Sequence, residues 1–271
     1  MNARIFRGEI RLDAIPANDR CLAYGDGLFE TMRVHRGEVP WWREHWTRLR
    51  LGAERLGIPL PDEARVRAEA ASLFVDGGDG VLKLLVTRGA GERGYAPPPD
   101  PVPTWIVSRH GVPATPGRSL HLHVCGTRLA SQPTLAGIKH CNRLEQVLAR
   151  SEAERAGADE GLMLDMAGNV IGATAANLFA TIDGCWVTPA IVDCGIAGVC
   201  RAKLLSALDA VERALPLAEV ESADAVFLCN AVRGILPVAR LGAREWSPHP
   251  AVAAARTALS RLHPSFAVEP A

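Results

Sequence analysis

Residues 135–148 place a lysine directly before a predicted helix. Asn142, followed three residues later by Glu145, is the pattern of a helix N-cap with its capping-box partner. Apolar residues at positions 144, 147 and 148 then follow helical spacing, and the helix is predicted to run to about residues 156–157. Lys139 therefore precedes a rigid element, on a short segment from which its side chain can face a cleft.

Lys139 is one of three lysines in the chain, and the others are Lys83 and Lys203. Arginine supplies the rest of the 30 basic residues. A lysine kept in such an arginine-rich chain points to chemistry that arginine cannot perform. Formation of a Schiff base is one example, because it needs a primary amine that can lose its proton. A solvated loop lysine is the ordinary alternative.

Composition excludes several classes of protein. The chain has 271 residues, 48% of them hydrophobic, which is enough for one large or two modest domains. Its 30 acidic and 30 basic residues balance, and no basic stripe with interleaved aromatic residues occurs, so nucleic acid is not expected as a partner. No apolar run approaches the ~20 residues that span a bilayer. The start of the sequence leads into a polar strand and not a signal peptide, so a cytoplasmic protein is expected.

Seven cysteines, an odd number without a CxxC motif, favour reduced and mostly buried thiols over a disulfide framework. His121 and His123 form an HxH pair that strand alternation would put on one face. No second pair of ligands lies nearby in the sequence, so no metal site is predicted.

The first half of the chain alternates predicted strands and helices. A Gly-Asp-Gly turn at residues 25–27 leads into a strand predicted over 28–34. Apolar residues at positions 42, 46, 49, 53 and 56 predict an amphipathic helix that ends near Gly57. Arg48 lies on this helix in a His-x-x-Arg-Leu sequence. Its planar guanidinium suits paired phosphate oxygens, and a solvated arginine is the ordinary alternative.

A glycine-rich loop follows a strand predicted over residues 81–87. The loop, at residues 87–95, contains Arg88, Arg93 and Tyr95 among three glycines. Such a loop is poor core material and suits the binding of a carboxylate at the mouth of a cleft. A flexible surface loop is an equal alternative.

The second half is predicted to be strand-rich, with hairpin turns at residues 167–169 and 183–184. A glycine-containing turn at 195–198 leads into a helix predicted over 199–213. The first N–H groups of a helix and the positive end of its dipole form a ready phosphate site, although many helices begin this way. A strand predicted over 225–229 is followed by a loop at 229–234.

The sequence Leu-Ala-Gly-Ile-Lys-His-x-Asn-Arg-Leu-Glu-Gln-Val-Leu of residues 135–148 resembles the cofactor-lysine segment of the aminodeoxychorismate lyases. These enzymes belong to the class IV aminotransferase family of pyridoxal 5'-phosphate (PLP) proteins. Weaker similarity runs from about residue 24 to 237. The resemblance implies an α+β, two-domain fold of fold-type IV, similar to D-amino acid and branched-chain aminotransferases. A smaller N-terminal α/β sandwich (1–110), a linker (111–118) and a larger, barrel-like, PLP-binding α/β domain (119–271) are expected.

The resemblance also implies a role for each candidate residue. Lys139 would bind PLP and act as the catalytic residue, and a homodimer is the usual assembly. The candidate cofactor-binding residues are Arg48, Lys139, Gly198, Val199, Cys200, Asn230 and Ala231, and the candidate substrate-binding residues are Phe29, Arg93 and Tyr95. Which of Arg88, Arg93 and Arg143 binds a substrate carboxylate stays open.

Three functions are compatible with the resemblance. The first is a PLP-dependent lyase that converts 4-amino-4-deoxychorismate to 4-aminobenzoate and pyruvate in folate biosynthesis, and the match at Lys139 favours it. The second is a PLP-dependent aminotransferase acting on branched-chain or D-amino acids. The third is a non-catalytic protein that binds PLP or an anion.

Gly172 departs from the family pattern. Five residues before the position of Asn177, family members usually carry a glutamate that pairs with the pyridine nitrogen of PLP, and this chain has glycine there. Asp165 or a water could fill the place. The loss of a carboxylate there is expected to harm transamination more than elimination, because it makes PLP a weaker electron sink.

Overall fold

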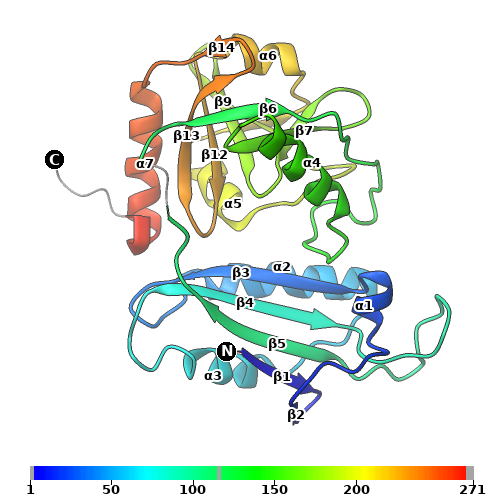
Figure 1. The fold of residues 1–271 in the computed structure, drawn as a ribbon. Helices are drawn as coiled ribbons and strands as arrows, with labels where there is room; N and C mark the ends of the chain where they lie inside the picture. Colours follow the sequence, from blue (N-terminus) through cyan, green and yellow to red (C-terminus); the bar gives the residue numbers. More distant parts are fainter. Residues whose placement is uncertain (1–2, 115–116, 267–271) are drawn as a thin grey trace. The chain divides into compact units, whose positions relative to one another are not determined.

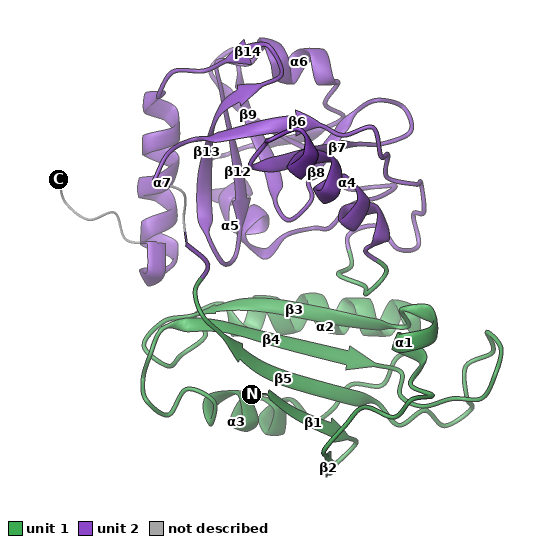
Figure 2. Cartoon of the chain, viewed as in Figure 1, with its two compact units in different colours: residues 1–112, 138–142 green, residues 113–137, 143–271 purple. Residues whose placement is uncertain are grey.

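The computed structural model describes residues 3–114 and 117–266 and divides the chain into two compact units. The first contains Met1–Val112 and Ile138–Asn142, and the second contains Pro113–Gly137 and Arg143–Ala271 (Figure 2). The segment with Lys139 lies within the range predicted for the larger domain, but it belongs by its contacts to the first unit. Within the predicted linker, residues 115–116 lie outside the described part of the chain.

An antiparallel five-stranded sheet forms the first unit, in the order β2-β1-β5-β4-β3. Two longer helices accompany it: α2 packs against β3, and α3 packs against β5 (Figure 1). The elements of this unit are β1 (Ala3–Arg7), β2 (Ile10–Leu12), α1 (Arg20–Tyr24), β3 (Gly27–Val34), α2 (Trp42–Leu56), α3 (Glu63–Ala71), β4 (Gly80–Thr87) and β5 (Thr104–His110).

Helical spacing of apolar residues accounts for α2. Its buried residues include Trp42, His45, Leu49 and Ala53, which recur every three or four positions and form one face. Burial of a side chain such as that of Leu49 contributes about 1.5–3 kcal/mol. The helix ends where Gly57, at φ 63°, donates its N–H to the Ala53 carbonyl. The predicted end near Gly57 is confirmed.

The second unit is built on a curled, nine-stranded mixed sheet. Its main path runs β11-β10-β9-β12-β13-β6-β7-β8, and β14 pairs with β13 beside this path. Contacts of β8 with β9 and β10 curl the sheet toward closure, which agrees with the predicted barrel-like form. The strands are β6 (Leu120–Val124), β7 (Glu160–Leu164), β8 (Val170–Ala173), β9 (Asn177–Ile182), β10 (Cys185–Pro189), β11 (Val211–Arg213), β12 (Ala225–Asn230), β13 (Gly234–Leu241) and β14 (Arg244–Glu245).

Helices cover this sheet on several sides. α4 packs on β6 and β7, α6 on β9, and α5 and α7 contact each other and β12 (Figure 1). The helices are α4 (Leu144–Arg155), α5 (Val199–Ala207), α6 (Leu217–Ser222) and α7 (Pro250–Leu262), followed by the 3-10 helix η1 (Pro264–Phe266). Within the described ranges, none of the helices has the length and apolar character needed to cross a membrane.

The predicted capping box at the start of α4 is wrong. Arg143 is the N-cap residue and makes no side-chain cap. The Asn142 amide instead donates to the Gly25 carbonyl at 3.1 Å, and the Glu145 carboxylate accepts from the Ala130 N–H at 3.0 Å. Hydrogen bonds to residues distant in sequence therefore replace the local ones.

The helix predicted over residues 199–213 is too long, since α5 ends at Ala207. Asp209 has a positive φ of 48°, which turns the chain out of the helix. Residues Val211–Arg213 then form β11, which pairs in parallel with β10. Pairing with β10 thus places Val211–Arg213 in a strand, although helical spacing had predicted them to be part of the helix.

Candidate active site

Lys139 lies in an extended segment beside the start of β3. Phe29 donates its N–H to the Lys139 carbonyl at 3.0 Å, and Cys141 donates its N–H to the Gly27 carbonyl at 2.9 Å. The Lys139 amine lies 4.3 Å from the centroid of the Phe29 ring. The lysine side chain is half-buried. Two backbone hydrogen bonds therefore position Lys139 and bring it together with Phe29, a predicted substrate-binding residue.

A buried ion pair on α2 and β3 engages Arg48. Arg48 Nε donates to Glu30 Oε1 at 2.8 Å, and a second guanidinium nitrogen binds Glu30 Oε2. His45 Nδ1 is hydrogen-bonded to Glu30 Oε2 at 2.7 Å. His45 and Arg48 are three positions apart on α2, so both side chains reach one carboxylate on β3. The sequence reading did not identify Glu30 or His45 as parts of the site.

Glu30 is ionised in this environment. Burial alone would raise the pKa of its carboxyl, but the charge of Arg48 and the hydrogen bond with His45 lower the pKa to about 2. The carboxylate therefore fixes the orientation of Arg48 across the ordinary pH range. An arginine held at two of its nitrogens presents the rest of its fork in a defined direction.

Asp26, at the centre of the Gly-Asp-Gly turn, holds two arginines. Its carboxylate accepts from Arg20 Nε at 2.8 Å and from Arg88 Nε at 2.7 Å. Burial opposes ionisation, but these two partners lower the pKa of Asp26. Arg88 also donates to the carbonyls of Leu56 and Gly57 at the end of α2. Arg88 is therefore a structural residue, which removes it from the arginines considered for the substrate carboxylate.

Arg20 anchors the glycine-rich loop. Its buried guanidinium donates to the carbonyls of Gly94, Tyr95 and Ala96 at 3.1, 2.9 and 3.2 Å. The Arg93 and Tyr95 side chains are exposed, and the Tyr95 ring contacts the Tyr24 ring at 5.4 Å between centroids. The structure thus gives the loop a fixed backbone, a feature that the sequence reading missed. Binding of substrate by Arg93 and Tyr95 stays a prediction.

In the second unit, the start of α5 is shaped by Asn177. A Cβ at Gly198 would overlap the Asn177 side-chain oxygen, so glycine is required there. The Asn177 amide also donates to the Ile196 carbonyl at 2.9 Å. Val199 and Cys200 are the first two residues of the helix, where backbone N–H groups have no carbonyl acceptor within the helix. The turn is therefore a built helix N-terminus suited to an anion.

The loop after β12 lies at the neighbouring strand end, because Cys229 pairs with Asn177 across β12 and β9. The Asn230 side chain accepts from the N–H groups of Val232 and Arg233 and donates to the Ala175 carbonyl. Asn230 thus shapes the loop that carries Ala231. A direct contact of Asn230 or Ala231 with a cofactor stays a prediction.

Gly172 lies in β8, one residue before the tight turn that joins β8 to β9. A Cβ at Gly172 would lie 2.9 Å from the Ala176 carbonyl oxygen, which is too close for a side chain without movement of the backbone. The two oxygens of Asp165 accept from Ala167 and Asn169 in the turn after β7. The structure therefore gives no support to Asp165 as the replacement acid that the sequence suggested.

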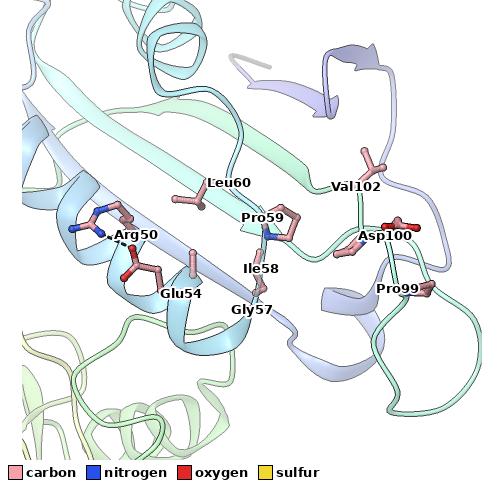
Figure 3. Close-up of a pocket in the computed structure, with 11 residues that line it drawn as sticks. Arg50, Glu54, Gly57, Ile58, Pro59, Leu60, Pro99, Asp100 and Val102 are labelled. Carbon is pink, nitrogen blue, oxygen red and sulfur yellow. Dashed lines mark hydrogen bonds and ion pairs between the residues drawn. The ribbon is translucent and has the colours of Figure 1, made fainter.

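One pocket in the first unit is lined by none of the residues predicted to form the site. It has a volume of about 670 Å³ and lies between the end of α2 and the proline-rich segment at residues 99–102 (Figure 3). In the described residues no group of three or more potential ligands could hold a metal ion, and His121 and His123 remain an isolated pair on β6.

Two of the three groups predicted to contact PLP have fitting chemistry, each within its own unit. Lys139 offers a partly exposed primary amine, the group that binds an aldehyde covalently. The start of α5 offers the N–H donors that a phosphate needs. At the position predicted to face the pyridine nitrogen, Gly172 offers no charged partner.

Comparisons with known proteins agree with this chemistry. Residues 27–241 match the family described as amino-transferase class IV. The chain is 35% identical over 240 residues to aminodeoxychorismate lyase of Vibrio harveyi, covering 85% of this chain and 89% of the relative. It is 31% identical over 236 residues to a putative branched-chain-amino-acid aminotransferase of Methanocaldococcus jannaschii, covering 83% and 82%.

A solved structure gives the same result. The crystal structure of 4-amino-4-deoxychorismate lyase from Pseudomonas aeruginosa superposes with a TM-score of 0.88 at 43% identity, covering 95% of this chain and 98% of that chain. The predicted fold-type IV architecture and the resemblance to aminodeoxychorismate lyases are confirmed. The chain belongs to the class IV aminotransferase family, whose members are PLP-dependent.

Proposed function

We propose that this protein is a PLP-dependent lyase that converts 4-amino-4-deoxychorismate to 4-aminobenzoate and pyruvate, a step in folate biosynthesis. One observation carries the proposal: a chain with Lys139 fixed beside β3 is 35% and 43% identical, over most of its length, to two aminodeoxychorismate lyases. When bound, PLP supplies an electron sink for the charge that develops on the substrate.

Lys139 has two roles in this proposal. It first binds the cofactor through its amine. With cofactor and substrate bound, the Lys139 amine would take the proton from the ring carbon that bears the substrate nitrogen, and would return it as an acid. The enolpyruvyl group leaves from the neighbouring ring carbon, and the aromatic product favours this step. The backbone hydrogen bonds at Phe29 and Cys141 support this assignment, since they fix the main chain on both sides of Lys139.

The remaining predicted residues bind and orient. Arg48 and the N–H groups of Val199 and Cys200 hold the cofactor phosphate, with the loop of Ala231 beside α5. The support for Arg48 is its fixed orientation on Glu30. For the helix start, the support is the close packing of Asn177 on Gly198.

Substrate recognition falls to Phe29, Arg93 and Tyr95. The substrate carries two carboxylates, and a guanidinium beside a phenol suits such a dianion. The contact between the Phe29 ring and the Lys139 amine supports placing a flat ring nearby. Arg20 would keep Arg93 and Tyr95 in place through the loop carbonyls.

The aminotransferase alternative has weaker support. The identity to a putative branched-chain aminotransferase is 31%, below the values for the two lyases. Gly172 also offers no carboxylate to the cofactor ring, which disfavours a reaction that needs a long-lived carbanion. The third alternative, a protein without turnover, is tested by the same assay.

The decisive assay measures both products. Purified, PLP-loaded protein is incubated with 4-amino-4-deoxychorismate, and 4-aminobenzoate and pyruvate are measured together. Equal amounts of both are expected, with very low transamination of alanine, branched-chain amino acids or D-alanine. Strong transamination without 4-aminobenzoate would establish the aminotransferase reading, and absence of both activities would establish the non-catalytic one.

We also infer a cytoplasmic homodimer. On α4 the side chains of Leu144, Val147 and Leu148 are 77%, 57% and 58% exposed and form one apolar stripe, which supports burial against a second copy. None of the seven cysteines forms a disulfide in the structure, which supports a reducing compartment. Light scattering of the wild type should give twice the chain mass of 29.0 kDa, and Val147→Asp should shift it toward the monomer.

A further inference from the structure

Two cysteine side chains meet beside the segment that carries Lys139. Cys21 lies on α1, and Cys141 lies two residues after Lys139. A Cβ built at Gly27 would lie 3.1 Å from Cys21 Sγ and 3.3 Å from Cys141 Sγ, so both sulfurs occupy the space above one glycine. The two thiols are hydrogen-bonded to each other.

The backbone holds both cysteines in this position. Asp19 caps α1 by accepting the Cys21 N–H at 2.9 Å, and its other oxygen accepts from the Thr87 hydroxyl at the end of β4. Cys141 donates its N–H to the Gly27 carbonyl at 2.9 Å. Both cysteines are half-buried, so a small solute can reach them. The pair is therefore preformed by the fold and accessible.

The hydrogen bond from Cys141 also lowers the pKa of Cys21, although burial and the carboxylates of Asp19 and Asp26 act in the opposite direction. A lower pKa increases the fraction of thiolate, which is the form that reacts with oxidants.

A second cysteine pair in the protein provides an internal contrast. Cys200 and Cys229 are also hydrogen-bonded, but both are buried, and the hydrogen bond and burial raise the pKa of Cys200 well above its ordinary value. Burial likewise raises the pKa values of Cys125 and Cys194 to about 11. These four thiols are expected to be inert toward oxidants.

We propose that Cys21 and Cys141 form a redox-responsive pair that hydrogen peroxide converts to a reversible intramolecular disulfide. The Cys21 thiolate attacks one peroxide oxygen, the O–O bond breaks, and a sulfenic acid and one water form after protonation. The Cys141 thiol then attacks the Cys21 sulfur, the S–S bond forms, and the S–O bond breaks with loss of a second water. The two sulfurs are oxidised by two electrons in total, and one molecule of hydrogen peroxide is reduced to two waters.

This disulfide would act on the proposed lyase site, and that part of the inference rests on the proposed function. An S–S bond is ~2.05 Å long, so the two hydrogen-bonded sulfurs must approach each other. The movement draws the segment of Lys139 toward α1, which carries the loop-anchoring Arg20. Because a small displacement of a catalytic group reduces turnover strongly, oxidation is expected to lower kcat by roughly tenfold to a hundredfold.

Peptide mapping of the oxidised holoenzyme tests the proposal. PLP-loaded protein carrying Cys185→Ser, which removes the one exposed cysteine, is treated with stepwise hydrogen peroxide, alkylated and digested without reductant. A disulfide-linked peptide pair containing Cys21 and Cys141 is expected, with Cys200 and Cys229 recovered as alkylated thiols. Dithiothreitol should remove the crosslink and restore kcat. Cys21→Ser should lose the crosslink and the reversible inactivation while keeping the basal rate, and Cys141→Ser should lose the crosslink.

Two outcomes would overturn the proposal. One is recovery of Cys141 as an alkylated thiol after full oxidation of Cys21, and the other is a crosslink between Cys200 and Cys229 instead. A crosslink between Cys21 and Cys141 that leaves kcat unchanged would overturn its effect on the site. The mapping does not depend on activity, so failure of the proposed lyase function would leave the result on the disulfide readable.

Discussion

Arg48 and Glu30 form a two-point ion pair in which the carboxylate is almost fully buried, at 1% side-chain exposure. His45 binds the same carboxylate from one turn earlier on α2. The His-x-x-Arg sequence of this helix therefore serves to grip Glu30, and Glu30 in turn orients Arg48. Removal of one partner of such a pair leaves an uncompensated charge in the interior.

Glu30→Gln should destabilise the protein by roughly 3–5 kcal/mol at pH 7. The carboxyl has a folded-state pKa of about 2, against 4.5 for an ordinary glutamate. Because the folded-state pKa is the lower one, the stabilisation by ionised Glu30, on the order of 3 kcal/mol, is fully present above pH 4.5 and is lost as the pH falls toward 2. Urea unfolding of wild type and variant at several pH values should show the difference narrowing over that range.

Glu54→Gln is the matched control, since Glu54 pairs with Arg50 on the exposed side of the same helix (Figure 3). Its effect should be about 0.5 kcal/mol or less. A Glu30→Gln variant as stable as this control at pH 7 would show that the buried pair does not stabilise the fold.

Arg48→Ala should weaken PLP binding by roughly 1.5–3 kcal/mol, the range for hydrogen bonds to charged groups. Arg48→Lys separates the two roles of the residue, because a lysine can still neutralise Glu30 but has no fork for the phosphate. Both variants should therefore lose PLP affinity, and Arg48→Lys should lose less stability. Cofactor titration by fluorescence measures the affinity, with Arg50→Ala as the control. Wild-type PLP affinity in both variants would remove Arg48 from the phosphate site.

Local periodicity predicted some of this structure well. The end of α2 at Gly57 and the end of β3 at Val34 follow from side-chain spacing and from turn residues, which act within a few positions. The predicted cap by Asn142 failed because the Asn142 amide binds the Gly25 carbonyl, a partner 117 positions away in the sequence. The spacing of neighbouring residues carries no information about a hydrogen-bond partner so distant in the sequence.

The candidate site likewise contains residues that the sequence could identify and residues that only the fold could identify. Lys139 could be identified from residue chemistry and the resemblance of its neighbours. Sequence could not separate Arg88 from Arg93, because both occur in one loop. The difference arises only in the fold, where Arg88 reaches Asp26 and the end of α2 while Arg93 is exposed. Glu30 was missed because its role depends on His45 and Arg48, which lie on the next helix and not beside Glu30 in the sequence.

Lys139→Ala should abolish both turnover and the absorbance of the covalently bound cofactor. Borohydride treatment of the wild type should fix the cofactor on the peptide that contains Lys139. Lys83→Ala is a close control, because the Lys83 amine also lies near the Phe29 ring, at 5.5 Å from its centroid. That variant should keep its activity. A label on Lys83 or Lys203 would show that the site has been assigned to the wrong lysine.

Arg93→Ala should raise KM for 4-amino-4-deoxychorismate by roughly tenfold or more, the worth of one charge-assisted hydrogen bond. PLP affinity should change much less. Glu92→Ala is the control, since Glu92 is exposed in the same loop. Steady-state kinetics and PLP titration on the same samples measure both quantities. Unchanged kinetics in Arg93→Ala would return the loop to a structural role.

Gly172→Ala should destabilise the protein by roughly 1–3 kcal/mol, the usual cost of overpacking. The added Cβ would lie 2.9 Å from the Ala176 carbonyl oxygen, which itself accepts the Ala173 N–H at 2.8 Å. The turn from Ala173 to Ala176 must therefore move. Gly111→Ala is the control, because nothing lies within 4 Å of a Cβ there, and its effect should stay within about 0.5 kcal/mol. Equal unfolding free energies for the two variants would contradict the tight turn.

Gly172→Glu extends this test to the chemistry. If the turn moves enough to admit the side chain, a carboxylate beside the pyridine nitrogen would keep that nitrogen protonated and deepen the electron sink. A transaminase must hold its carbanion until a proton returns at another atom, whereas an elimination can expel its leaving group at once. The variant should therefore raise the single-turnover rate of transamination with alanine more than the lyase rate. The cofactor absorbance of the resting variant should also shift, which reports the nitrogen independently of turnover. If wild-type protein already transaminates alanine rapidly, or if Gly172→Glu changes neither absorbance nor reaction preference while folding normally, then position 172 does not face the cofactor ring.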